Sequence, residues 1–177
     1  MEGSMKIGVV SAEGRGETDR LLAEVADAMQ AEGIRTAGIV KVLEHVSAFE
    51  NGCDMKVRVL PDGPVIKITQ SLGQGSGSCR LDPSAIAESV AQVENGTLDD
   101  AHLLILNKFG PEEINGRGFR GVIGKALDLG IPVLVGIGSA SRAEFDTFSG
   151  GLAETLPGET EAIRDWCMGA VRHRTEG

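Results

Sequence analysis

A glycine-bearing turn near the N-terminus has most of the spacing of a phosphate-binding loop. The apolar run Ile7 to Val10 precedes it, and an amphipathic helix is expected directly after it. In the pattern G-x-x-x-x-G-K-[ST], Ser11 takes the place of the first glycine, Gly16 that of the second, and Thr18 that of the hydroxyl residue. Glu17 stands where the lysine that neutralises phosphate belongs. A carboxylate there replaces attraction with repulsion, so we expect the loop to keep its shape and to lose the usual chemistry.

A second stretch, residues 103–113, shows a related exchange. Its apolar part is typical of a buried strand that ends in an acidic magnesium ligand, but Asn107 and Lys108 take the acidic places. The loops that follow these two strands are residues 11–18 and 107–113. In open parallel sheets, ligands bind at the carboxyl ends of the strands. We therefore expect one shared site for a small anion or a nucleotide. Its candidate residues are Ser11, Gly14, Arg15, Gly16, Glu17, Thr18, Asn107, Lys108, Gly110 and Glu113.

The loop allows two interpretations. Backbone amides at a helix N-terminus bind phosphate, sulfate or molybdate without a lysine, and Arg15 or Lys108 would offset the nearby carboxylates. In the structural interpretation, the glycines only open a helix and Glu17 complements its dipole. A further hypothesis is an ion pair between Glu17 and Lys108 across the site, because lysine and acid have changed places on loops that we expect to be adjacent. Its alternative is two unrelated exposed charges.

Two cysteine-containing segments form a second candidate cluster. Both border loops that flank an expected β-hairpin, so their side chains could meet around an oxyanion, a soft metal or a reversible oxidation. The cluster comprises Cys53, Asp54, Cys79, Arg80 and Asp82. In the structural alternative, Asp82 is a helix N-cap and the cysteines are small buried hydrophobes. Cys167 and Trp166 lie on the inward stripe of the last helix and are expected in the core.

Length and composition restrict the class of protein. With 177 residues, 41% of them apolar, and 25 glycines, residues 1–177 are expected to form a single turn-rich domain. A net charge of −9 without a basic stripe argues against nucleic acid as a partner. No apolar run reaches the roughly 20 residues that span a bilayer, and no leader of basic then apolar residues begins the chain. We expect a cytoplasmic protein without membrane insertion; Met1 to Ser4 are either native or an extension before Met5.

Apolar spacing predicts alternating strands and helices. Helices are expected over 16–31, 83–93, 119–127 and 163–171, and strands near 7–10, 36–42, 101–106 and 132–137. Two alternating runs about Pro61, Asp62 and Gly63 predict a β-hairpin near 55–69. This order is typical of a three-layer α/β domain around a mostly parallel central sheet.

Four segments are similar to an uncharacterised bacterial family with a degenerate P-loop NTPase-like fold. They are Cys53 to Met55, Cys79 to Asp82, Asn107 to Gly110 and Phe148 to Gly151. More distantly, residues 6–18 and 107–136 resemble the small nucleoside-triphosphatases of the cancer-related type. The acidic residues that this family carries at the end of the second strand are absent here. Members of the bacterial family are often encoded near molybdate-transport genes. The resemblance implies a P-loop-like fold and an association with molybdenum or other oxyanions, and it implies no particular reaction.

Three functions stay open at this point. The first is a non-hydrolytic P-loop-like protein that binds a small anion, such as molybdate, or a nucleotide. The second is a nucleoside-triphosphatase in which Glu113 orients water and Arg15 or Lys108 contacts phosphate. The third is a module for a protein partner with a vestigial pocket. The exchanged residues Glu17, Asn107 and Lys108 argue against an enzyme.

Overall fold

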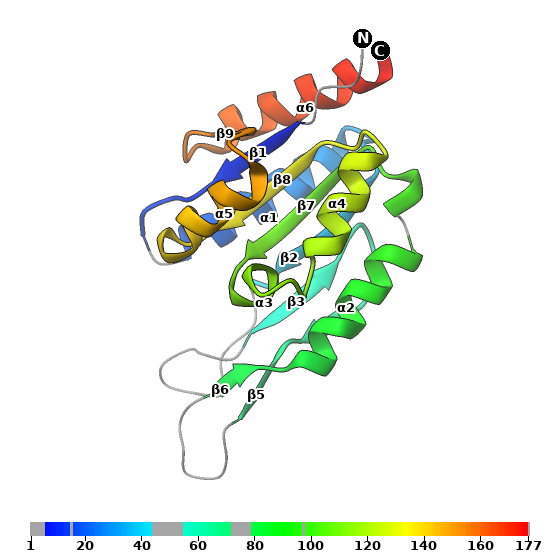
Figure 1. Cartoon of the computed structure of the whole chain (residues 1–177). Helices are drawn as coiled ribbons and strands as arrows, with labels where there is room; N and C mark the ends of the chain where they lie inside the picture. Colours follow the sequence, from blue (N-terminus) through cyan, green and yellow to red (C-terminus); the bar gives the residue numbers. More distant parts are fainter. Residues whose placement is uncertain (1–5, 15, 44–54, 72–78, 97, 177) are drawn as a thin grey trace.

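The computed structural model confirms the α/β architecture with a mostly parallel central sheet (Figure 1). It describes the chain over residues 6–14, 16–43, 55–71, 79–96 and 98–176. Within these ranges, seven strands form the main sheet. In spatial order they are β4 (Val65–Lys67), β3 (Lys56–Val59), β2 (Thr36–Lys41), β7 (Leu103–Phe109), β8 (Val133–Ile137), β1 (Ile7–Val10) and β9 (Ala153–Thr155). The five strands from β2 to β9 are parallel, whereas β3 and β4 join the β2 edge as an antiparallel hairpin.

Helices cover both faces of this sheet (Figure 1). The helices are α1 (Glu17–Ala31), α2 (Pro83–Asn95), α3 (Pro111–Ile114), α4 (Arg120–Asp128), α5 (Arg142–Ser149) and α6 (Thr160–Glu176), with short 3-10 turns η1 (Leu98–Asp100) and η2 (Ser139–Ser141). Helices α1 and α6 pack on one face, and α2, α4 and α5 pack on the other. None of the helices in the described ranges is long and apolar enough to cross a membrane.

Strand β7 shows how the apolar run divides between the two cores. Leu103 and Ile105 pack with the α1–α6 side, while Leu104 and Leu106 pack with the α2–α4–α5 side. Alternate residues of a strand point to opposite faces, so a strand covered on both faces is apolar throughout. Burial on both faces of the sheet therefore explains why the sequence of β7 is apolar almost throughout.

The predicted hairpin exists, but its second half is divided between two sheets. Strand β4 ends at Lys67, and β5 (Thr69–Ser71) pairs antiparallel with β6 (Cys79–Leu81) in a separate two-stranded sheet. The chain changes partner at Ile68, which donates its N–H to Met55 and accepts from the backbone of Asp82 at 2.7 Å. The predicted hairpin is therefore formed by β3 and β4, and the segment after Lys67 belongs to the second sheet.

Candidate functional site

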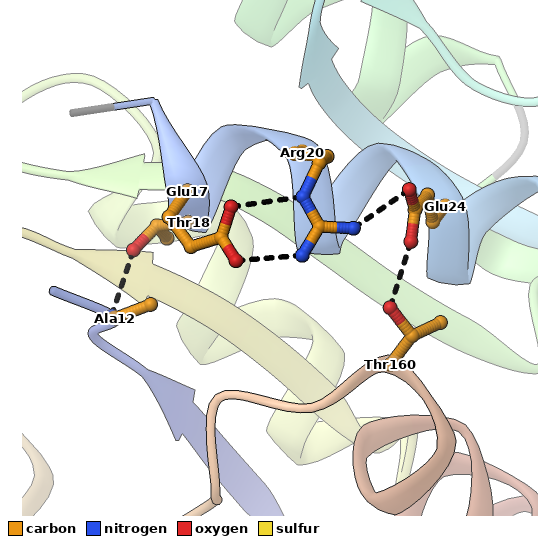
Figure 2. Close-up of polar contacts among 6 residues, drawn as sticks. All are labelled: Ala12, Glu17, Thr18, Arg20, Glu24 and Thr160. Atoms are coloured by element: carbon orange, nitrogen blue, oxygen red, sulfur yellow. Dashed lines mark hydrogen bonds and ion pairs between the residues drawn. The ribbon is translucent and has the colours of Figure 1, made fainter. Parts of the chain in front are cut away.

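The loop between β1 and α1 folds back onto the first turn of the helix. Gly14 and Gly16 have φ values of 99° and 76°, a left-handed conformation that glycine adopts without strain. Thr18 accepts a hydrogen bond from the N–H of Ala12 at its Oγ1 atom, at 2.9 Å (Figure 2). The Thr18 hydroxyl therefore closes the loop over the helix N-terminus. Arg15 lies outside the described residues.

Glu17 is directed along the helix surface and binds Arg20. Its two carboxylate oxygens accept from Nε and Nη2 of Arg20 at 2.8 and 2.6 Å (Figure 2). Arg20 also donates to Glu24 at 2.8 Å, and Glu24 accepts from Thr160 at 2.7 Å, which ties α1 to the start of α6. The hydrogen bonds from Arg20 hold the pKa of Glu17 below its usual range. The negative charge at the lysine position is thus paired within its own helix.

A polar hollow of about 570 Å³ lies over the loop. Its lining comprises Ser11, Ala12, Glu13, Gly14, Gly16, Thr18, Asp19, Lys108, Ile137, Gly138 and Ser139. Five predicted site residues therefore meet here, and Glu17 does not line the hollow. Lys108 is exposed at its rim, and no ion pair to Lys108 occurs among the residues that the structure describes. Among the residues that the structure describes, the cation that lines the hollow comes from β7 and not from α1.

Strand β8 separates the two loops that we expected to be adjacent. Val10 of β1 pairs with Gly136 of β8, which pairs in turn with Asn107 of β7. Two strand spacings amount to about 10 Å. The bonds of Glu17 to Arg20 direct its carboxylate along α1, and the hypothesised ion pair with Lys108 is not present among the described ion pairs. The two loops share a sheet edge and line one hollow, although their strands β1 and β7 are not direct neighbours.

Asn107 reaches α1 across the intervening strand. Its Nδ2 donates to Asp19 Oδ1 at 2.9 Å, and the other oxygen of Asp19 lies 3.4 Å from Nζ of Lys41, at the end of β2. Gly136 makes this approach possible because a Cβ atom there would lie 2.5 Å from Leu22 Cδ1, 3.0 Å from Thr18 Cγ2 and 3.5 Å from Asn107 Oδ1. Asp19, Asn107 and Lys41 therefore form one polar row at the edge of the sheet.

Sequence reasoning missed three contributors to this region. Asp19 lies outside the apolar stripe of α1, yet its carboxylate is directed at the strand ends, with only 18% of its side chain exposed. Lys41 is the last residue of β2 and Ser139 follows β8, so both lie at the carboxyl end of a buried parallel strand. That position was the available signal for both residues, since ligands bind at this edge. For Asp19 no local signal exists, because helical spacing of apolar residues does not say where the polar side chains lie.

An apolar cleft of about 150 Å³ adjoins the polar hollow, and Asp19 and Lys108 line both. Its remaining lining is Ile39, Lys41, Met55, Val57, Ile68, Leu81, Ile86, Ser89, Asn107, Gly110, Pro111, Glu112, Glu113 and Phe119. The other predicted site residues, Asn107, Gly110 and Glu113, thus belong to the cleft and not to the hollow. The candidate site has a polar part and an apolar part that meet at two charged residues.

Glu113 is buried and its carboxylate is fully engaged by the backbone. It accepts from the N–H of Gly110 at 2.8 Å and from that of Phe119 at 2.9 Å. Burial raises the pKa of Glu113, against the opposing effect of these hydrogen bonds. Gly118 has no side chain to obstruct the carboxylate. Glu113 therefore holds the 110–119 turn together, and the hypothesis that it orients a water molecule would require it to release these bonds.

The structure describes only part of the second candidate cluster. Cys53 and Asp54 lie outside the described residues, and for Cys79 the structure gives only its backbone in β6. Asp82 caps α2, accepting from the N–H groups of Ser84 and Ala85 at 3.0 and 3.4 Å. The structural alternative therefore holds for Asp82. Among the described residues, no group of three or more His, Cys, Asp or Glu side chains could hold a metal ion.

Arg80 and the last helix complete the comparison with the predictions. Arg80 is exposed and lies opposite Gln70 in the β5–β6 pair. In the amide orientation of Gln70 that satisfies both groups, its side-chain oxygen accepts from Nε of Arg80 at 2.9 Å. Cys167 is fully buried, as predicted, and burial raises the pKa of its thiol to about 12. Trp166 is only half-buried, and its Nε1 donates to Glu154 at 3.1 Å. Trp166 therefore packs against the core, as predicted, but is only partly buried in it.

Two comparisons with known proteins bear on this chain. The family model described as "Protein of unknown function (DUF2478)" matches residues 7–166, from β1 into α6, and so includes the lining of both cavities. The "Molybdenum import ATP-binding protein ModC 2" of Bradyrhizobium diazoefficiens is 32% identical over 152 residues. This match covers 85% of the chain but 17% of that protein, so the chain spans about a sixth of its relative's length.

Proposed function

We propose that this chain, which belongs to the DUF2478 family of proteins of unknown function, binds a small oxyanion or a nucleotide in its polar hollow without hydrolysing it. The observation that carries the proposal is the exchange of charges at the loop. Glu17 is paired with Arg20 outside the hollow, while Lys108 lines it. The described lining of the hollow therefore combines Lys108 with the Thr18 and Ser139 hydroxyls and the loop at the N-terminus of α1, groups that suit an oxyanion. It also includes the carboxylates of Glu13 and Asp19, and that of Asp19 is engaged by Asn107 and Lys41.

The strand end of β7 favours binding over hydrolysis. Phosphoryl transfer in P-loop proteins uses a carboxylate at this place to hold magnesium. Here Asn107 occupies it, and the nearest carboxylate, Asp19, is engaged by Asn107 and Lys41. Glu113, the residue that the hydrolase hypothesis assigned to water, is bound to two backbone amides. Asp19 and Glu113 are thus engaged by other groups, and among the described residues no group of three or more His, Cys, Asp or Glu side chains could hold a metal ion.

The relative named for molybdenum import makes molybdate a candidate ligand. That protein's name describes an ATP-binding function, but the similar segment is only 17% of its length. We therefore include a link to molybdenum in the proposal and do not transfer the relative's import function to this chain. The volume of the hollow, about 570 Å³, lies within the range of about 300–1,000 Å³ typical of small-ligand pockets, so both an oxyanion and a nucleotide fit.

A thermal-shift panel with orthophosphate, sulfate, molybdate, tungstate, ATP and GTP, each with and without magnesium, tests the proposal. A ligand at about 100 times its Kd stabilises the fold by about 2.7 kcal/mol, which corresponds to roughly 5–10 °C for a chain of this size. Lys108→Ala should abolish the shift. Lys67→Ala is the matched control, because it removes the same charge from exposed strand β4.

Two outcomes would contradict the proposal in different ways. If none of these ligands shifts the melting temperature, or if both lysine variants respond like the wild type, the hollow is not an anion site. If phosphate is released from ATP or GTP in the presence of magnesium and the release is lost in Lys108→Ala, the protein is a hydrolase. A shift with molybdate alone would select the oxyanion over the nucleotide.

A further inference from the structure

We infer that the ligand is an organic oxyanion with a single apolar aromatic ring, and that this ring occupies the cleft beside the polar hollow. The inference rests on the proposed anion site and specifies the class of its ligand. The two cavities share Asp19 and Lys108 in their linings, so a ligand whose anionic group contacts Lys108 has the cleft directly next to it. An inorganic oxyanion would leave this second cavity unused.

The lining of the cleft is predominantly aliphatic and aromatic. Ile39 of β2 and Val57 of β3 contribute from the sheet, Ile86 from α2, and Phe119 from the turn before α4. Most charged and amide groups of the lining are paired: Asp19 binds Asn107 and Lys41, Glu112 binds Arg117, and Glu113 accepts from two backbone N–H groups. The cleft thus has a largely apolar surface and, where it meets the hollow, one cation, Lys108, beside the Asp19 carboxylate that Asn107 and Lys41 engage.

The volume of the cleft suits one six-membered ring. An apolar cavity of 150 Å³ lined by Leu, Ile and Phe in another protein binds benzene and excludes water. The cleft here has about the same volume, and Ile39, Ile86 and Phe119 are among the apolar residues that line it beside charged and polar ones. Aromatic rings carry a large apolar area and need no hydrogen-bond partner, so a phenyl-type ring gains the hydrophobic contribution without a desolvation cost.

The polar groups inside the cleft are already satisfied, which disfavours a nucleobase. Ser89 donates its hydroxyl to the backbone oxygen of Ala85 at 3.0 Å, and both oxygens of Glu113 accept from backbone amides. A base edge has several donors and acceptors, and burying them without partners costs free energy. A ring without polar edge atoms avoids that cost.

Isothermal titration calorimetry with phenyl phosphate and with orthophosphate tests the inference. Burial of a phenyl ring is worth a factor of about 10–150 in affinity, so phenyl phosphate should bind at least tenfold more tightly than orthophosphate. Ser89→Leu fills the cleft from α2 and loses only a bond within its own helix. It should remove this advantage and leave the affinity for orthophosphate unchanged. Ala91→Leu, an exposed position of the same helix, is the matched control and should bind as the wild type does.

The outcomes separate this inference from the function on which it rests. Equal affinities for the two phosphates, or an advantage that persists in Ser89→Leu, would overturn the aromatic ligand and leave the anion site intact. Tighter binding of uridine 5′-monophosphate than of phenyl phosphate would overturn it in favour of a nucleobase. Absence of binding by all three would overturn the anion site itself. If Ser89→Leu does not fold, Ile68→Phe fills the same cleft from the other side and carries the same expectation.

Discussion

Gly136 is the position where one added methyl group most directly tests the packing between α1 and the sheet edge. In Gly136→Ala, the new Cβ would lie 2.5 Å from Leu22 Cδ1 and 3.0 Å from Thr18 Cγ2. Leu22 is fully buried, so its side chain has no solvent to move into. Overpacking of this kind costs about 1–3 kcal/mol. We expect a loss of about 2 kcal/mol in the free energy of unfolding, or roughly 4–8 °C in Tm for a chain of this length.

Thermal and urea unfolding of Gly136→Ala measure this loss, and anion titration measures its effect on the site. The displaced helix N-terminus should weaken the bond between Asp19 and Asn107 and so change the affinity as well as the stability. Gly124→Ala is the control: it lies within α4 with no atom within 4 Å of an added Cβ, so alanine should stabilise the helix by up to about 1 kcal/mol. If Gly136→Ala melts within about 1 °C of the wild type, the close approach across β8 does not exist and the reasoning is refuted.

Three further predictions follow from the charges and burial of single side chains. Glu113→Gln should lower the free energy of unfolding by about 1–3 kcal/mol, because its amide group would face a backbone N–H donor, as urea unfolding at neutral pH would measure. It should also remove part of the pH dependence: burial raises the pKa of Glu113, so the folded state binds a proton more readily than the unfolded state and stability falls as pH rises above the ordinary value of about 4.3. A wild-type profile no steeper than that of the variant would contradict this. Asp19→Asn should strengthen oxyanion binding by a factor on the order of 5, since it removes a negative charge that lines both cavities; calorimetry that finds weaker binding would argue against an anion site. Cys167, whose thiol pKa is raised to about 12 by burial, should stay unmodified by iodoacetamide at about pH 8 in the folded protein and react once the protein is unfolded. Mass spectrometry of the Cys167 peptide measures this, and labelling in the native state would contradict the prediction.

Much of the fold follows from local patterns in the chain. The stripe of Leu21, Leu22 and Val25 predicts α1, and the Asp82 N-cap followed by Pro83 predicts the start of α2, since both signals act over one or two helical turns. The β5–β6 pair was not predictable in this way. Its strands have three residues each, without apolar alternation, and their pairing joins Gln70 to Arg80 across a segment rich in glycine and serine.

The sequence predicted where in the fold the candidate site lies, but not how its side chains are directed. Two loops after buried strands were expected at one sheet edge, and Ser11, Thr18 and Lys108 do line a common hollow. The expectation that Glu17 would repel an anion there did not anticipate its bonds to Arg20, which direct the carboxylate elsewhere. A motif states which residue occupies a position, whereas the direction of a long charged side chain depends on the partners within its reach.

The amino-acid sequence by itself determined the alternation of strands and helices, the glycine turn before α1 and the exchange of the two expected phosphate- and metal-binding residues. These features depend on neighbours a few residues apart, and periodic apolar side chains encode them directly. Only the tertiary structure decided that β8 lies between the two loops and that Asn107 bonds to Asp19, a residue 88 positions away in the chain. Strand order and such contacts are set by how whole faces pack together in three dimensions, and no local spacing carries that information.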